Sequence, residues 1–192
     1  NWLAGLIGAE DGEERPHVAL DRLAGAVPAG SDGVLCLPYF LGEKTPIHDP
    51  LARGTFTGLS LGHGKGHLWR ALLEAVAYGF RHHLDVLTEM GHRPSRVFAS
   101  DGGSKSRVWM QIVADVVGLP VRLLDNPHGS SVGAAWVAAI GSGLSSDWSG
   151  VSALARHGDL IEPDPANRAV YDRGYARYRT AYEALKPVFA MD

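Results

Sequence analysis

Cysteine is almost absent from this sequence, which has Cys36 alone among 192 residues. A single cysteine excludes an intrachain disulfide and is typical of proteins in a reducing cytoplasm, where we expect this chain to be located. Cys36 stands between Leu35 and Leu37, so we expect it to be a small buried strand residue. A catalytic thiol needs an accessible, electropositive setting, which these neighbours do not suggest.

The sequence also lacks an excess of basic charge and any long apolar run. Its 18 lysines and arginines are outnumbered by 21 acidic residues, which gives a formal net charge of -3. We therefore expect no nucleic-acid partner, and the apolar runs are too short for a membrane span. The histidine pairs His63/His67 and His82/His83 have no cysteine or carboxylate at a recognised spacing, which argues against a metal site.

The most informative stretch, residues 96–121, predicts a strand, a sharp turn and a helix. The apolar run at 97–99 is typical of a buried strand, and residues 101–103 (Asp-Gly-Gly) then turn the chain. Ser104 is the predicted N-cap of a helix that ends at Gly118. Bare glycine backbone beside a helix start can cradle a nucleotide or an anion. A tight turn in an ordinary α/β domain is the alternative interpretation.

Hydrophobic periodicity predicts the remaining elements, which mix helices and strands along the chain. We expect helices at about 1–10, 18–26, 67–90, 131–140, 151–155 and 166–186, and further strands at 33–37, 55–59 and 121–124. Residues 38–53 are rich in proline, glycine and charge, so they predict a long ordered loop. This order favours an α/β domain built around one sheet.

Polar side chains of the loop at 38–53 allow two interpretations. They could line a cleft, as long ordered loops often carry function; the candidates are Glu43, Lys44, His48, Asp49 and Arg53. Alternatively, Asp49 and Arg53 pair with each other around Pro50 and hold the loop in shape.

Two further patterns on predicted helices favour structural roles. Arg70 and Glu74 lie one helical turn apart and can form an ion pair. The tyrosines of the last helix could suggest base stacking, but their spacing of three or four residues fits core packing better; they are Tyr171, Tyr175, Tyr178 and Tyr182.

Two long segments resemble the FGGY family of carbohydrate kinases. The stretch DGGSKSRVWMQIVADVVGLPV is similar to the family's adenosine-binding segment. The earlier run LPYFLGEKTPIHDPLARGTFTGL, continuing to HLWRALLEAVAYG, is similar to a second signature of the family; the matching residues are Gly54, Gly58, Leu59, His67, Leu68, Ala71 and Glu74. The stretches SVGAAWVAAIGSG and YDRGYARYRTAY resemble the family's last two helices, and the family pattern gives Glu74 a buried structural role.

This resemblance implies an actin-like ATPase fold of the ribonuclease-H-like kind, with a central mixed sheet flanked by helices. Residues 1–192 would be the C-terminal nucleotide-binding domain of a two-domain sugar kinase. Its N-terminal domain, with the phosphate loop, the catalytic aspartate and most sugar contacts, would be absent from this chain. The first residue is Asn1 and nothing near it resembles a signal peptide, which also suggests a fragment. We expect such a fragment to be inactive alone.

The resemblance further implies that ATP and Mg²⁺ are cofactors and that the adenosine lies at Gly102 and Gly103. Ser104, Lys105 and Arg107 would complete this site, with Arg107 one turn into the helix. A pentulose such as xylulose is the favoured substrate, and exposed apolar surface could support a homodimer. His128 stands where many sugar kinases have a glutamate, which argues against naming a sugar by analogy. The alternative is a non-catalytic nucleotide-binding or regulatory module that keeps the fold.

Overall fold

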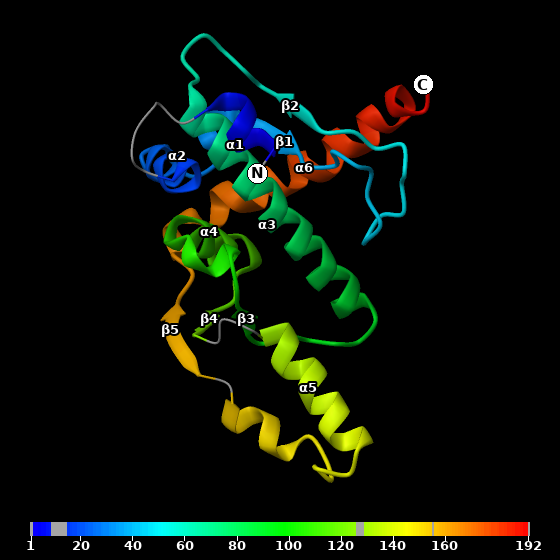
Figure 1. The fold of residues 1–192 in the computed structure, drawn as a ribbon. Helices are drawn as coiled ribbons and strands as arrows, with labels where there is room; N and C mark the ends of the chain where they lie inside the picture. The colour runs from blue at the N-terminus through cyan, green and yellow to red at the C-terminus, as the bar shows by residue number, and fades with distance from the viewer. Residues whose placement is uncertain (1, 9–14, 126–128, 155, 192) are drawn as a thin grey trace.

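The structure, a computed structural model, describes residues 2–8, 15–125, 129–154 and 156–191. Figure 1 shows the long helix α3 (Lys65–Glu89) in the middle of the molecule, beside α4 and the β1–β2 pair. The other helices are α1 (Trp2–Ile7), α2 (Pro16–Gly25), α4 (Arg107–Val117), α5 (Gly129–Gly141) and α6 (Arg168–Phe189). Short 3-10 turns lie at Ser31–Gly33, Gly103–Lys105, Ser149–Leu154 and Pro165–Asn167. No described helix is long and apolar enough to cross a membrane.

The described strands form two small sheets instead of the single sheet expected from the sequence. In the first, β1 (Leu35–Leu37) pairs antiparallel with β2 (Thr55–Thr57). In the second, β4 (Val121–Leu124) lies between β3 (Val97–Ala99), to which it is parallel, and β5 (His157–Ile161), to which it is antiparallel. This second sheet is mixed, as predicted, but β5 was not expected. Its sequence, HGDLI, has a glycine and a charge, and only one of its five residues is buried.

The core lies where α3 packs against α2, α4, β1 and α6. The four tyrosines of α6 are all buried, which confirms their predicted packing role, and none is more than 9% exposed. Cys36 in β1 is fully buried, also as predicted. Burial raises the pKa of its thiol to about 12, so the group stays protonated and unreactive in the folded protein.

The loop at 38–53 is ordered, but Asp49 and Arg53 stabilise it through separate bonds instead of pairing. The Asp49 carboxylate accepts hydrogen bonds from Leu51 N at 2.9 Å, Ala52 N at 3.2 Å and the Tyr182 hydroxyl at 2.7 Å. The Tyr182 bond is the main reason that the pKa of Asp49 is lowered. Arg53 donates to the carbonyl oxygens of Pro50 and Ala52, both at 3.0 Å. Asp49 therefore stabilises the loop and its contact with α6.

Candidate functional site

In the turn between β3 and α4, the residue with a positive backbone φ is Asp101 and not one of the glycines. Asp101 has a φ of +67°, in the left-handed region, whereas Gly102 has φ −58° and ψ −47°. The Ser104 hydroxyl donates to the Asp101 carbonyl at 2.8 Å, which closes the turn. The glycines are therefore not needed here for a positive φ, and their function must come from the lack of a side chain.

Ser106, not Ser104, is the N-cap of α4. A 3-10 turn at Gly103–Lys105 separates the glycines from this helix, which begins at Arg107. The Ser106 hydroxyl accepts a hydrogen bond from Trp109 N at 3.1 Å. The prediction that Ser104 and Lys105 begin the helix, with Arg107 one turn inside it, is wrong for this reason.

Two cavities meet at Gly103. The larger measures about 720 Å³ and the smaller about 520 Å³, and Trp109 borders both. Aromatic side chains from distant parts of the chain form much of the larger cavity's wall: Trp2, Phe40 and Trp69. The smaller cavity is largely apolar and includes Phe80 and Phe98. A planar aromatic ligand would find stacking partners and apolar surface on either side of the turn.

The two glycines have different surroundings. A Cβ built on Gly103 would overlap Cζ3 of the Trp109 ring, so only glycine fits there without a shift. A Cβ on Gly102 has nothing within 4 Å, and its backbone faces the larger cavity. The indole nitrogen of Trp109 is buried, and no described residue accepts its hydrogen bond. An unpaired buried donor beside an open cavity is a position that a ligand acceptor or a water can satisfy.

The structure brings together most, but not all, of the predicted site residues. Gly102, Gly103 and Lys105 border the larger cavity, and Ser104 borders the smaller one. Arg107 is directed elsewhere: its guanidinium pairs with Asp159 of β5 at 2.7 Å, and both side chains are more than 60% exposed, at 62% and 66%. The predicted contact of Arg107 with a base or ribose would therefore need this ion pair to break.

Sequence reasoning missed the other side chains of the site because they come from distant elements. Trp109 was visible only as one member of a helical stripe that predicts core. Ser106 was hidden by its neighbour in the run SKS, where either serine can cap a helix. Trp2, Phe40 and Trp69 lie far from the turn in sequence, and no local pattern connects them to it. His128 lies outside the described residues.

A buried network holds α2, α3 and α6 together beside this region. Glu74 is 2% exposed, and its carboxylate accepts from Arg70 Nε at 2.8 Å and Gly30 N at 2.9 Å. Its second oxygen accepts from the Ser31 hydroxyl at 2.9 Å. The hydroxyl of Tyr171 on α6 bonds to both Glu74 and Arg70. The predicted pairing of Arg70 with Glu74 in a buried structural role is confirmed.

Comparisons of the sequence and of the structure with known proteins both find carbohydrate kinases. The sequence model for the C-terminal domain of the FGGY family of carbohydrate kinases matches residues 2–142. A xylulose kinase of Staphylococcus epidermidis is 33% identical over 191 residues, which are 99% of this chain and 38% of that protein. A gluconokinase of Bacillus subtilis is 35% identical over 175 residues, which are 91% of this chain and 32% of that protein.

Among solved structures, xylulose kinase from Rhodospirillum rubrum has a TM-score of 0.86 and 60% sequence identity. The match covers 99% of this chain and 38% of that one. The chain therefore spans less than two fifths of the length of these relatives.

Proposed function

The chain belongs to the FGGY family of carbohydrate kinases, and we propose that it is the C-terminal, ATP-binding domain of a kinase that phosphorylates a sugar or polyol hydroxyl. The α/β, actin-like ATPase fold expected from the sequence is confirmed by the similarity to xylulose kinase structures. A pentulose such as xylulose is the favoured acceptor, because the S. epidermidis and R. rubrum proteins are both xylulose kinases.

The observation that carries this proposal is the bare backbone of Gly102 at the edge of the larger cavity. A purine and its ribose can lie directly against this backbone, because no Cβ occupies the space. The aromatic wall offers stacking partners for the base, and the free indole N–H of Trp109 offers a donor. Lys105, which is exposed and borders the same cavity, would meet a phosphate in this proposal.

ATP would supply the transferred phosphoryl group, and Mg²⁺ would neutralise charge on it. In the described ranges no cluster of three or more His, Cys, Asp or Glu side chains is arranged to hold a metal ion. We therefore assign no residue of this chain to Mg²⁺. The chain's own contribution is to bind and orient the adenosine, which positions the reacting phosphate for the remainder of the enzyme.

The catalytic base, the first phosphate loop and most sugar contacts are proposed to lie in the part of the kinase that this chain does not span. The chain alone is then expected to bind nucleotide without phosphorylating sugar. A cytoplasmic location and a homodimer stay predictions. The alternative function is a non-catalytic module that keeps the fold, and the ion pair that holds Arg107 away from both cavities is the observation that favours it.

Calorimetric titration of the chain with Mg-ADP tests the proposal, with Gly102→Leu as the informative variant. Leucine suits the backbone angles of Gly102 and meets no atom with its Cβ, so the variant should fold while its side chain fills the adenosine position. Gly62→Leu is the matched control, since the Cβ of residue 62 meets only Ser60 Oγ, at 3.9 Å.

We expect saturable ADP binding by the wild type and by Gly62→Leu, and at least tenfold weaker binding by Gly102→Leu, about 1.4 kcal/mol. Equal binding by all three proteins would move the nucleotide away from Gly102. Binding by none of them, with no rise in melting temperature in millimolar ADP, would contradict nucleotide binding by this chain.

A further inference from the structure

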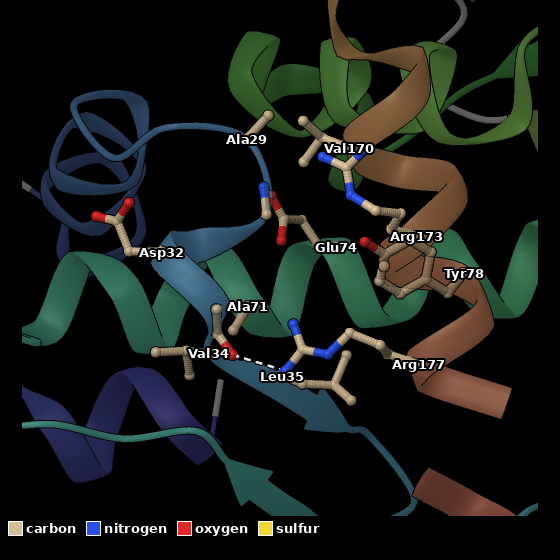
Figure 2. A pocket seen from close by; sticks show the side chains of 13 residues that line it. Ala29, Asp32, Val34, Leu35, Ala71, Glu74, Tyr78, Val170, Arg173 and Arg177 are labelled. Atoms are coloured by element: carbon tan, nitrogen blue, oxygen red, sulfur yellow. Dashed lines mark hydrogen bonds between the residues drawn. The ribbon is translucent and has the colours of Figure 1, made fainter. Parts of the chain in front are cut away.

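A third cavity, of about 340 Å³, lies between α3, α6 and the segment that leads into β1 (Figure 2). It has no lining residue in common with the two cavities at Gly103. Figure 2 shows that Glu74 and Tyr78 reach it from α3, and Arg173 and Arg177 from α6. Its volume is at the lower limit for ligand pockets, which suits a small molecule better than a nucleotide.

The side chain of Tyr78 is buried, and its hydroxyl is directed toward the cavity (Figure 2). Tyr78 is 2% exposed and borders the cavity. Its oxygen packs over Gly174, where a Cβ would overlap it. No described residue forms a hydrogen bond with this hydroxyl, although its aromatic ring packs against Tyr171, Tyr175 and Tyr178. Burial raises the pKa of Tyr78, so the hydroxyl remains protonated and can donate a hydrogen bond into the cavity.

Two guanidinium groups lie at the mouth of the same cavity. Arg173 and Arg177 are one helical turn apart on α6, so both project on the same side. Arg177 donates to the Gly33 carbonyl at 3.0 Å, which fixes it against the β1 segment and leaves its other N–H groups free to bind. Arg173 is exposed and has no partner among the described residues. Each guanidinium carries a permanent charge and a fork of donors that matches an oxyanion.

Of the two carboxylates that border this cavity, only Glu74 is neutralised by an arginine. Glu74, at its inner end, is paired with Arg70 and accepts four hydrogen bonds in all. Asp32, at the rim, lies 3.3 Å from Nε2 of His67 on α3. Arg173 and Arg177 together outweigh the one carboxylate, Asp32, that no arginine neutralises, so the mouth keeps a net positive charge. Two guanidinium forks can engage more oxygens of a phosphate than of a carboxylate, which favours a phosphate.

We propose that this cavity binds a small molecule bearing a phosphate group, with Arg173 and Arg177 holding the phosphate and the Tyr78 hydroxyl donating to a ligand oxygen. The site is independent of the nucleotide position at Gly102. Three donors from two helices surround one volume, and the apolar side chains of Ala71 and Val170 supply the rest of the wall.

Titration of the whole chain with inorganic phosphate at constant ionic strength, followed by ³¹P NMR, tests this site. Arg173→Gln should weaken binding at least tenfold, because a charged donor is lost. Tyr78→Phe should weaken it about fivefold while leaving the melting temperature unchanged, because the hydroxyl has no protein partner to lose. Arg93→Gln, in the loop after α3, removes the same charge elsewhere and should bind as the wild type does.

The controls separate this site from the others. Saturating ADP should not displace phosphate, and acetate should bind at least tenfold more weakly than phosphate. The proposal is overturned if no saturable binding occurs below about 20 mM, or if Arg93→Gln loses as much affinity as Arg173→Gln. It is equally overturned if Tyr78→Phe and Arg173→Gln bind as the wild type does, or if ADP competes. Acetate binding as tightly as phosphate would overturn the choice of a phosphate.

Discussion

Alanine at Gly102 and alanine at Gly103 should change the stability of the protein in opposite directions. The backbone angles of Gly102 are compatible with any residue, and a Cβ there meets nothing within 4 Å. A Cβ at Gly103 would overlap Cζ3 of Trp109 and lie 3.1 Å from Cε3. The two positions are adjacent in one turn, so the comparison isolates the contact with Trp109.

The expected magnitudes follow from these two environments. Gly102→Ala should stabilise the fold by about 0.4–1 kcal/mol, because alanine restricts the unfolded chain more than glycine does. Gly103→Ala should destabilise it by about 1–2 kcal/mol, the lower part of the usual range for overpacking. The lower part applies because Trp109 borders a cavity on each side and can shift. The two variants should therefore differ by about 1.5–3 kcal/mol.

Urea unfolding followed by far-UV circular dichroism measures this difference, provided that the slope with denaturant is the same in both variants. The expected difference in unfolding free energy corresponds to a difference in melting temperature of about 3–12 °C between the two variants, for a chain of this size. Near-UV circular dichroism should change in Gly103→Ala alone, because only that methyl group moves an indole ring. Equal unfolding free energies for the two variants, within about 0.5 kcal/mol, would refute the packing of Trp109 on Gly103.

Three further predictions concern the supporting structure. Glu74→Gln should destabilise the chain by about 3–5 kcal/mol in urea unfolding, because it leaves the buried Arg70 guanidinium without its carboxylate; a loss below about 1 kcal/mol would contradict this. Tyr182→Phe should destabilise the fold most above about pH 4, because the Tyr182 hydroxyl lowers the pKa of Asp49 in the folded protein. The stability that this bond adds is lost as the pH falls through the lowered pKa of Asp49. A loss of unfolding free energy that does not depend on pH would exclude this linkage. Cys36 should react with a thiol reagent only at the rate of unfolding, and fast labelling of the native chain would show that it is accessible.

The elements that could be predicted from the sequence are those with strong local signals. The strand at 121–124 has the predicted bounds, and Gly118 ends α4 with a φ of +69°, as a helix C-cap should. The strand β5 could not be predicted, because the strand with which it pairs, β4, lies 33 to 40 residues earlier in the chain. The division into two sheets is also non-local, since it depends on which strands meet and not on the pattern within any one of them.

The site was only partly predictable, because several of its contacts join residues that are distant in sequence. The Gly102–Gly103 turn was found because glycine, turn and helix are adjacent in sequence. The direction of Arg107 could not be found, because its partner Asp159 belongs to the unpredicted strand. Likewise, Glu74 was expected to pair with Arg70, but its bonds to Gly30 and Ser31 depend on how an earlier turn folds back.

The long helix α3 shows most clearly what hydrophobicity alone does not distinguish. Its predicted apolar stripe is core at its N-terminal end, where Trp69 and Leu73 are 5% and 7% exposed. Further along the helix, Phe80 is 42% exposed and borders the smaller cavity. On another face Glu74 and Tyr78 border the third cavity. Hydrophobic residues at helical spacing predict only which face of the helix is turned away from solvent. Whether it then meets protein or an empty volume that a ligand can fill is decided by the elements packed against it, so cavities on different faces of one helix stay hidden until those elements are placed.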